Sequence, residues 1–341
     1  MQPYMELTKQ GKIRRLRKLA FNALKQYDLD VTALHLVGAF TNTVFRVWGQ
    51  FRNGSPDGSS SYILRICFPG WRTDMDLRSE AIWLQALSRD TDIGVPKPYA
   101  ARDGEFIVTA GAPGVPEERR CILMSWLPGS LLGKHLTGTN LQKMGILFAR
   151  LHAHAAQFIP PPGFTQRKMD SIYARGEEDV LFTEKCTDAF TAHSLQVFQD
   201  TARCVDQTFA SLYAQPDGLR VIHNDLWHDN IKVDHGRLRP FDFEDTLWGY
   251  PVQDIAMALQ DLMRYVPPED FEPLQSAFQR GYESLSPWPE RWTGEIDSLR
   301  AGRMLWVCNY VARFEHQFLF DHIEYVTPIF ERFLETGLVR S

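Results

Sequence analysis

A polar stretch between residues 221 and 254 places chemically versatile side chains between short apolar runs. It contains the pattern His223-x-Asp225-x-x-x-x-Asn230, and Asp242 follows after a turn. An aspartate can accept the proton of a substrate hydroxyl, and amide and carboxylate oxygens are ligands for Mg²⁺ beside nucleotide phosphates. The spacing therefore predicts a base at Asp225 and metal ligands at Asn230 and Asp242.

Short apolar runs on both sides of this pattern predict the strands that hold it. Residues 221–222 and 231–234 are typical of brief strands, and His235-Gly236 predicts a turn into a further run at 237–241. Loops held between buried strands are frequent positions for reactive side chains. We therefore expect Asp225 to lie in a loop with well-ordered flanks.

The same stretch also permits a metal-dependent hydrolase. The ligand types that would hold paired metal ions are His223, Asp225, His228, Asp229 and Asp242. This alternative explains the histidines but leaves the features of the N-terminal third without a role.

The stretch resembles the catalytic loop and metal-binding segment of the aminoglycoside phosphotransferase-like kinases, which include choline kinases, type II homoserine kinases and bacterial stress-response Ser/Thr kinases. The last two are most similar, because residues 242–245 (Asp-Phe-Glu-Asp) are followed by Trp248-Gly249 and Gln253-Asp254. Family members usually carry Gly where Asn224 stands. This substitution bears on the loop backbone and not on its chemistry, since Asn tolerates a positive φ.

The resemblance also implies supporting roles near the loop. His223 is expected to hydrogen-bond the loop backbone, and Asp254 is expected to brace the loop from the start of a helix. Glu244 and Asp245 are open between assisting the metal and capping the following turn.

Arg65 interrupts the apolar run 62–66, and a cation on the buried side of a strand needs a partner. Helical periodicity over 76–88 places Glu80 on the next helix. The resemblance implies that Arg65 binds the α and β phosphates of ATP while Glu80 orients it, and a guanidinium can serve phosphate and carboxylate together. A purely structural Arg65–Glu80 bridge is the alternative.

Two further nucleotide contacts are implied by the resemblance alone. The runs 33–38 and 43–49 predict a hairpin, and Gly38, Thr41 and Asn42 at its end would contact the phosphates through main-chain and side-chain groups. Taken by itself, this is an ordinary hairpin.

A buried run at 121–124 leads into the segment 126–129, which would be the hinge between two lobes. Main-chain groups near Ser125 and Leu127 would then bind the adenine edge, with Trp126 as a packing residue.

The order of elements is a β-rich part with one prominent helix followed by a mostly helical part. Helices are expected at 6–27, 76–88, 141–158, 187–213, 251–265, 270–285, 292–320 and 322–336. The resemblance implies an α+β, bilobal, protein-kinase-like fold with an N-terminal lobe at 1–125, a hinge at 126–129 and a helical C-terminal lobe at 130–341. Nucleotide would bind between the lobes.

Composition narrows the classes of protein. The chain has 341 residues, 44% of them hydrophobic and 23% charged, with a formal net charge of −5. This charge argues against a dedicated nucleic-acid or anionic-membrane surface. The five scattered cysteines favour reduced thiols over disulfides or a zinc site. With neither an apolar signal core nor a membrane-spanning run, we expect a cytoplasmic protein.

The leading hypothesis is a kinase that uses ATP and Mg²⁺ to phosphorylate a hydroxyl of a small molecule, a metabolite or an antibiotic. Trp306, Tyr310 and Arg313 share one helix face, which would either line the acceptor site or pack in the core. Asp261 and Glu269 are candidate contacts for a cationic acceptor, with ordinary surface carboxylates as the alternative. A Ser/Thr protein kinase and a non-catalytic nucleotide-binding regulator are the alternatives. The identity of the acceptor, the choice between ATP and GTP, and the oligomeric state are left open.

Overall fold

The computed structural model describes residues 2–54, 58–174, 176–215 and 217–340. The chain forms two compact units. The first comprises Met1–Gly129 together with two short segments, Pro160–Phe164 and Arg239–Glu244, and the second comprises the remainder. The segment 51–61, rich in Asn, Gly and Pro, is typical of a long turn, and part of it, residues 55–57, lies outside the described residues.

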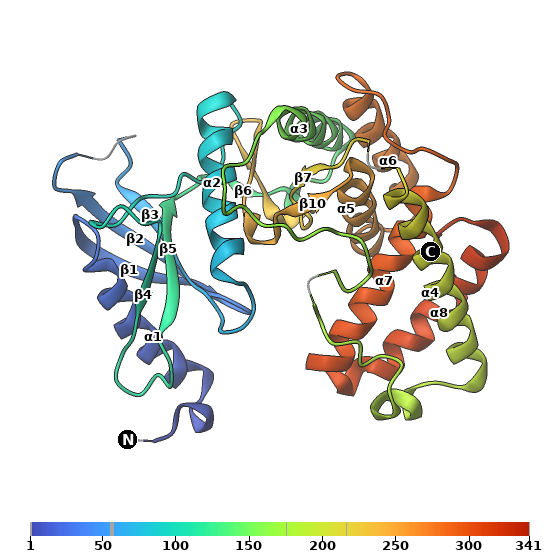
Figure 1. Cartoon of the computed structure of the whole chain (residues 1–341), viewed down its shortest axis with the longest axis horizontal. Coiled ribbons are helices and arrows are strands. Elements are labelled where there is room, and N and C mark those ends of the chain that lie inside the picture. Colours follow the sequence, from blue (N-terminus) through green and yellow to red (C-terminus); the bar gives the residue numbers. More distant parts are fainter. Residues whose placement is uncertain (1, 55–57, 175, 216, 341) are drawn as a thin grey trace. The chain divides into compact units, whose positions relative to one another are not determined.

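The first unit is built on an antiparallel sheet of five strands (Figure 1). The strands are β1 (Leu29–Ala39), β2 (Thr43–Phe51), β3 (Ser61–Ile66), β4 (Ile107–Ala110) and β5 (Arg119–Ser125). Their order across the sheet is β1-β2-β3-β5-β4. The alternating burial in β2, where Phe45 and Val47 are fully buried, shows that one face of the sheet packs on the core.

Two helices accompany this sheet, α1 (Lys9–Leu24) and α2 (Asp74–Asp90). Leu19, Ala20 and Ala23 of α1 are completely buried in a core that they share with the sheet. α2 starts at a capping box, in which Thr73 and Asp76 satisfy each other's main-chain N–H groups.

Asp103-Gly104 is typical of a hairpin turn between the runs 99–102 and 105–109, but this hairpin forms only in part. The main-chain N–H of Tyr99 donates to the Leu123 carbonyl, and that of Arg102 donates to the Gln26 carbonyl. Because these groups bond elsewhere, the first arm of the hairpin does not become a regular strand, and β4 starts only at Ile107.

The second unit is mainly helical. Its helices are α3 (Gly138–Gln157), α4 (Ala192–Tyr213), α5 (Pro251–Tyr265), α6 (Pro268–Glu283), α7 (Glu295–Phe314) and α8 (Leu319–Thr336). The helix expected over 292–320 ends at Phe314 because Glu315 has φ −139° and ψ 39°, values that are not helical. A short 3₁₀ turn, His316–Phe318, then leads into α8.

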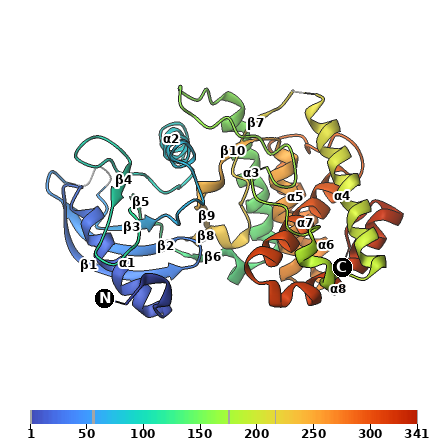
Figure 2. The same ribbon diagram turned by 60° about the horizontal axis from the view of Figure 1, so that its bottom comes forward.

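Short strands carry the polar stretch of residues 221–254. One sheet pairs β7 (Arg220–Ile222) with β10 (Leu247–Gly249). In the other, β8 (Ile231–Asp234) lies between β6 (Ser130–Leu131) and β9 (Arg237–Pro240) (Figure 2). The predicted turn at His235-Gly236 is present between β8 and β9, with positive φ at both residues.

Close packing of α3 on α6 depends on two glycines. A Cβ at Gly145 would overlap the carbonyl oxygen of Phe278, and one at Gly281 would overlap that of Gln142. The two backbones therefore approach more closely than side chains would permit.

The predicted α+β class is confirmed, with an antiparallel β-rich N-terminal part and a helical C-terminal part. Among the helices of the described residues, none combines the length and apolar character that a bilayer crossing requires.

Candidate active site

The loop between β7 and β8 brings Asp225 and Asn230 together. Asn230 ends a 3₁₀ turn, and its side-chain Nδ2 donates to the main-chain oxygen of Asp225 at 2.8 Å and to its carboxylate Oδ2 at 3.0 Å. Asn224 has a φ of 60°, the positive value for which Asn is better suited than most residues. The loop geometry therefore presents the predicted base and one predicted metal ligand side by side.

A buried carboxylate holds the start of this loop. Asp254, in the first turn of α5, accepts hydrogen bonds from the main-chain N–H groups of His223 at 3.0 Å and Asn224 at 2.6 Å. Asp254 Oδ2 also lies 3.2 Å from His152 Nε2. The ring Nδ1 of His223 accepts from the main-chain N–H of Asp225 at 3.3 Å. These are the contacts expected of two supporting residues, His223 and Asp254.

A cation that the sequence did not single out lies beside Asp225. Arg303 of α7 places Nη2 3.3 Å from Asp225 Oδ1 and 3.1 Å from Asp261 Oδ2. Burial would lower the pKa of Arg303, but attraction to Asp261 and then Asp225 outweighs it and raises the pKa. Asp261, a candidate contact for a cationic acceptor, forms an ion pair with Arg303.

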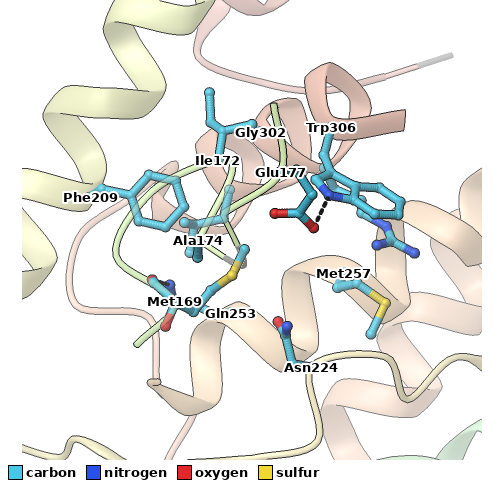
Figure 3. Close-up of a pocket in the computed structure, with 12 residues that line it drawn as sticks. Met169, Ile172, Ala174, Glu177, Phe209, Asn224, Gln253, Met257, Gly302 and Trp306 are labelled. Carbon is cyan, nitrogen blue, oxygen red and sulfur yellow. Dashed lines mark hydrogen bonds between the residues drawn. The ribbon is translucent and has the colours of Figure 1, made fainter. Parts of the chain in front are cut away.

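A cavity of the second unit adjoins this group of charges (Figure 3). The side chains that line it come from the segment 169–177 and from α4, α5 and α7, and Asn224 of the loop joins them. Its apolar wall consists of Met169, Ile172, Ala174, Phe209, Met257 and Leu299. Its polar lining comprises Glu177, Asn224, Gln253, Arg303 and Trp306.

Only one of the three residues proposed for the acceptor site lines this cavity. Trp306 does so, and its Nε1 donates to Glu177 Oε1 at 3.2 Å, the dashed contact in Figure 3. Tyr310 stacks on Trp306 with ring centroids 5.8 Å apart but is not part of the lining. Arg313 packs over Phe314 and is also not part of it. Glu177, which was not among the residues predicted from the sequence, does line the cavity.

In the first unit, Arg65 and Glu80 form the expected ion pair. Arg65 Nη1 donates to Glu80 Oε1 at 2.9 Å, while Nη2 donates to Oε2, so the contact is bidentate. Both residues are buried, with exposed fractions of 4% and 1%. Burial would lower the pKa of Arg65, but the attraction of Glu80 and Glu244 outweighs it and raises the pKa well above its usual value. Burial also raises the pKa of Glu80, and the attraction of Arg65 opposes that shift.

The predicted metal ligand Asp242 lies in the first unit beside Arg65, with Oδ1 3.4 Å from Nη1. Its side chain is 40% exposed, and its backbone has a φ of 64°. Glu244 Oε2 lies 3.8 Å from Arg65 Nε and accepts from Asn42 Nδ2 at 2.7 Å. Glu244 is thus part of the Arg65 cluster. Asp245 belongs to the second unit, where it is buried.

The other residues expected to bind nucleotide lie in the β1–β2 hairpin and in the segment around Ser125 and Leu127. Gly38 pairs with Val44 in the β1–β2 ladder, next to the turn that contains Thr41. The main-chain N–H of Ser125 donates to the Lys97 carbonyl at 2.9 Å.

The environment of His228 gives no support to the hydrolase alternative. Its ring packs against Trp227 and Tyr265, with centroid separations of 4.9 Å and 4.4 Å, and burial lowers its pKa. Among the residues that the structure describes, no three His, Cys, Asp or Glu side chains gather in a way that would hold a metal ion. His228 is a packed core histidine.

Comparison with known proteins decides the family. Residues 35–289 match the model of the phosphotransferase enzyme family, which covers most of the chain. The chain belongs to this family.

Relatives of this phosphotransferase include two curated proteins. The chain is 26% identical over 253 residues to an amicoumacin kinase of Bacillus subtilis (strain 168), covering 72% of each chain. It is 25% identical over 256 residues to an uncharacterized protein of Synechocystis sp., covering 73% of this chain and 66% of the relative.

Solved structures agree with the phosphotransferase fold. A microcompartment-associated aminopropanol kinase superposes with a TM-score of 0.74 at 22% identity, covering 95% of this chain and 99% of the other. An amicoumacin kinase in complex with AMP-PNP and Ca²⁺ superposes with a TM-score of 0.71 at 19% identity, covering 94% and 96%.

Proposed function

We propose that this phosphotransferase moves the γ-phosphate of ATP, in the presence of Mg²⁺, to a hydroxyl group of a small molecule. The observation that carries the proposal is the placement of Asp225. Its carboxylate is held by Asn230 and Arg303, and Arg303 lines the adjoining cavity, where we place the acceptor. A carboxylate so placed suits the acceptance of a hydroxyl proton.

The first unit would contribute the phosphate-binding cation. Arg65 is held by Glu80 in a bidentate pair, and Asp242 lies beside it. We propose that Arg65 contacts the α and β phosphates, and that main-chain groups near Leu127 bind the adenine. The hairpin end at Gly38, Thr41 and Asn42 would cover the phosphates.

The donor types at two positions fit a hard cation. Asn230 uses its amide nitrogen toward Asp225, so its amide oxygen is the atom suited to a metal, and Asp242 offers a half-exposed carboxylate. Bound Mg²⁺ would neutralise charge on the phosphates. Asn230 and Asp242 would hold the cation, and Asp225 would position the acceptor hydroxyl and take up its proton.

The chemistry of the cavity favours an acceptor that carries an amine as well as a hydroxyl. Glu177 places a carboxylate in a lining that combines apolar side chains with Asn224, Gln253, Arg303 and Trp306. Asp225, Asp261 and Arg303 together carry a net negative charge when all three are ionised. The kinases of amicoumacin and aminopropanol named above are consistent with such an acceptor.

The segment that follows Asp242 favours a small acceptor over a protein. It forms a 3₁₀ turn at Phe243–Asp245 and then β10, which pairs with β7. Within the described residues, this leaves no long loop after Asp242 of the kind that phosphorylation orders in protein kinases.

ADP release in the presence of Mg-ATP tests the proposal. The panel contains amino alcohols, aminoglycosides, the matching alcohols without an amine, and a protein mixture. We expect release that depends on an amine-bearing alcohol, and Asp225→Asn should lose it by at least about 100-fold while binding ATP normally in calorimetry. Absence of transfer to every acceptor would overturn the proposal.

A further inference from the structure

We propose that Arg303 is a positioning residue of the reaction, which fixes the carboxylate of Asp225 for proton acceptance, and that Asp261 in turn fixes Arg303. This inference rests on the proposed function, because it assigns Asp225 the role of the base. It adds two residues of the helical unit that no sequence motif marks.

The carboxylate of Asp225 is held at both oxygens. Oδ2 accepts from Asn230 Nδ2 at 3.0 Å, within the same loop, and Oδ1 lies 3.3 Å from Arg303 Nη2, on α7. A side chain with two free torsions needs two such contacts to hold one orientation. Asn230 alone would leave Oδ1 without the cation.

The guanidinium of Arg303 is itself restrained from two sides. Its Nη2 lies 3.1 Å from Asp261 Oδ2, on α5, and its Cζ lies 4.5 Å from the ring centre of Trp306. A flat, delocalised cation can stack on an indole and pair with carboxylates at its edge, which an ammonium group does less well. This arrangement explains why an arginine occupies the position.

The arrangement is costly for stability, which points to a role in chemistry. Arg303 Nε is buried and has no hydrogen-bond partner among the described residues. Buried ion pairs are often no more stabilising than apolar side chains of similar volume. A need for a positive charge beside Asp225 explains the buried arginine at position 303 better than a packing role does.

Steady-state kinetics of variants test the role on the acceptor found with the panel above. Misplacement of a reacting group by about 1 Å can cost about 100-fold, so we expect Arg303→Ala to lower kcat by about 100-fold with KM for ATP unchanged. Asp261→Asn should lower kcat by a smaller factor. The double variant should be no slower than Arg303→Ala, because the two residues act in series. Guanidinium ion in the buffer should restore part of the activity of Arg303→Ala.

Arg203→Ala is the matched control. Arg203 forms an ion pair with Asp200 on α4 and is exposed, so its loss should leave kcat unchanged. If Arg303→Ala does not fold, Arg303→Lys and Asp261→Asn test the role of Arg303 instead. A lower kcat with an unchanged KM for ATP is again the expected result.

The outcomes separate this inference from the proposed function. Wild-type protein that transfers phosphate, with Arg303 variants of normal kcat, would overturn the role of Arg303 and leave the proposed function in place. A loss confined to KM for ATP would overturn it too. Wild-type protein that transfers phosphate to no acceptor would overturn both.

Discussion

The Asp254 carboxylate lies 2.6 Å from the main-chain nitrogen of Asn224, the residue that turns the catalytic loop through a φ of 60°. The same carboxylate accepts from the main-chain N–H of His223. One buried side chain at the start of α5 thus satisfies two successive loop amides and fixes the backbone just ahead of Asp225.

Replacement of Asp254 by alanine should destabilise the protein strongly. Two buried N–H groups would lose their acceptor, and each unsatisfied group costs about 1–3 kcal/mol, so we expect the free energy of unfolding to fall by about 2–6 kcal/mol. Urea denaturation measures it. Asp200→Ala, which removes an aspartate from a surface pair on α4, should change it little. Equal effects of the two variants would contradict the bracing role.

Substitutions of Asn224 should separate backbone strain from side-chain chemistry. Glycine adopts a positive φ freely, whereas alanine in this region is strained by roughly 1–2 kcal/mol. We therefore expect Asn224→Gly to unfold at nearly the wild-type midpoint and Asn224→Ala to be less stable by about 1 kcal/mol. Thermal denaturation of both variants checks this order, and the reverse order would show that the side chain matters more than the φ value.

Loss of Arg65 should affect both stability and nucleotide binding. Removal of one partner of a buried ion pair leaves an uncompensated charge at Glu80 and costs about 3–5 kcal/mol. Arg65→Lys keeps the charge but loses the bidentate contact, so it should stay folded and bind Mg-ATP more weakly, as isothermal titration would show.

The exposed pair Arg89–Asp90 supplies the control for Arg65. Arg89→Ala should change the free energy of unfolding by no more than about 0.5 kcal/mol and leave the affinity for ATP unaltered. Normal ATP affinity in folded Arg65→Lys would instead favour the structural bridge between Arg65 and Glu80.

Acid should destabilise the protein partly through His228. Burial lowers the pKa of His228 below its ordinary value of 6.5, so the folded state favours the neutral ring. The resulting stability is complete above the unfolded pKa and is lost as the pH falls below about 6.5, by at most about 1.4 kcal/mol per pH unit. His228→Phe should therefore lose less stability than the wild type between pH 7 and pH 5 in urea denaturation.

The parts of the site that follow one another in sequence could be predicted. Asp225 and Asn230 belong to one loop, and Arg65 and Glu80 lie on a strand and the helix after it, where periodicity shows which side chains face inward. Local sequence patterns were therefore enough to predict these features. The Arg65–Glu80 ion pair and the positive φ of Asn224 are both present.

The partners that join distant helices could not be predicted in this way. Arg303 meets Asp225 only because α7 packs beside α5 in the folded unit, and nothing in the α7 sequence sets Arg303 apart from Arg300 or Arg313. The face shared with Trp306 was the only signal. The end of α7 at Phe314 was equally hidden, since the sequence there contains neither proline nor glycine.

The assignment of Arg239–Glu244 to the first unit has a practical consequence for protein dissection. A gene fragment that stops at residue 129 would encode the whole five-stranded sheet but would omit Asp242 and Glu244, the carboxylates that lie beside Arg65 together with Glu80. The buried guanidinium would then be left with one counter-charge in place of three. The β-rich unit is thus contiguous in space but not along the gene, and its separate expression would require residues 239–244 to be grafted onto it.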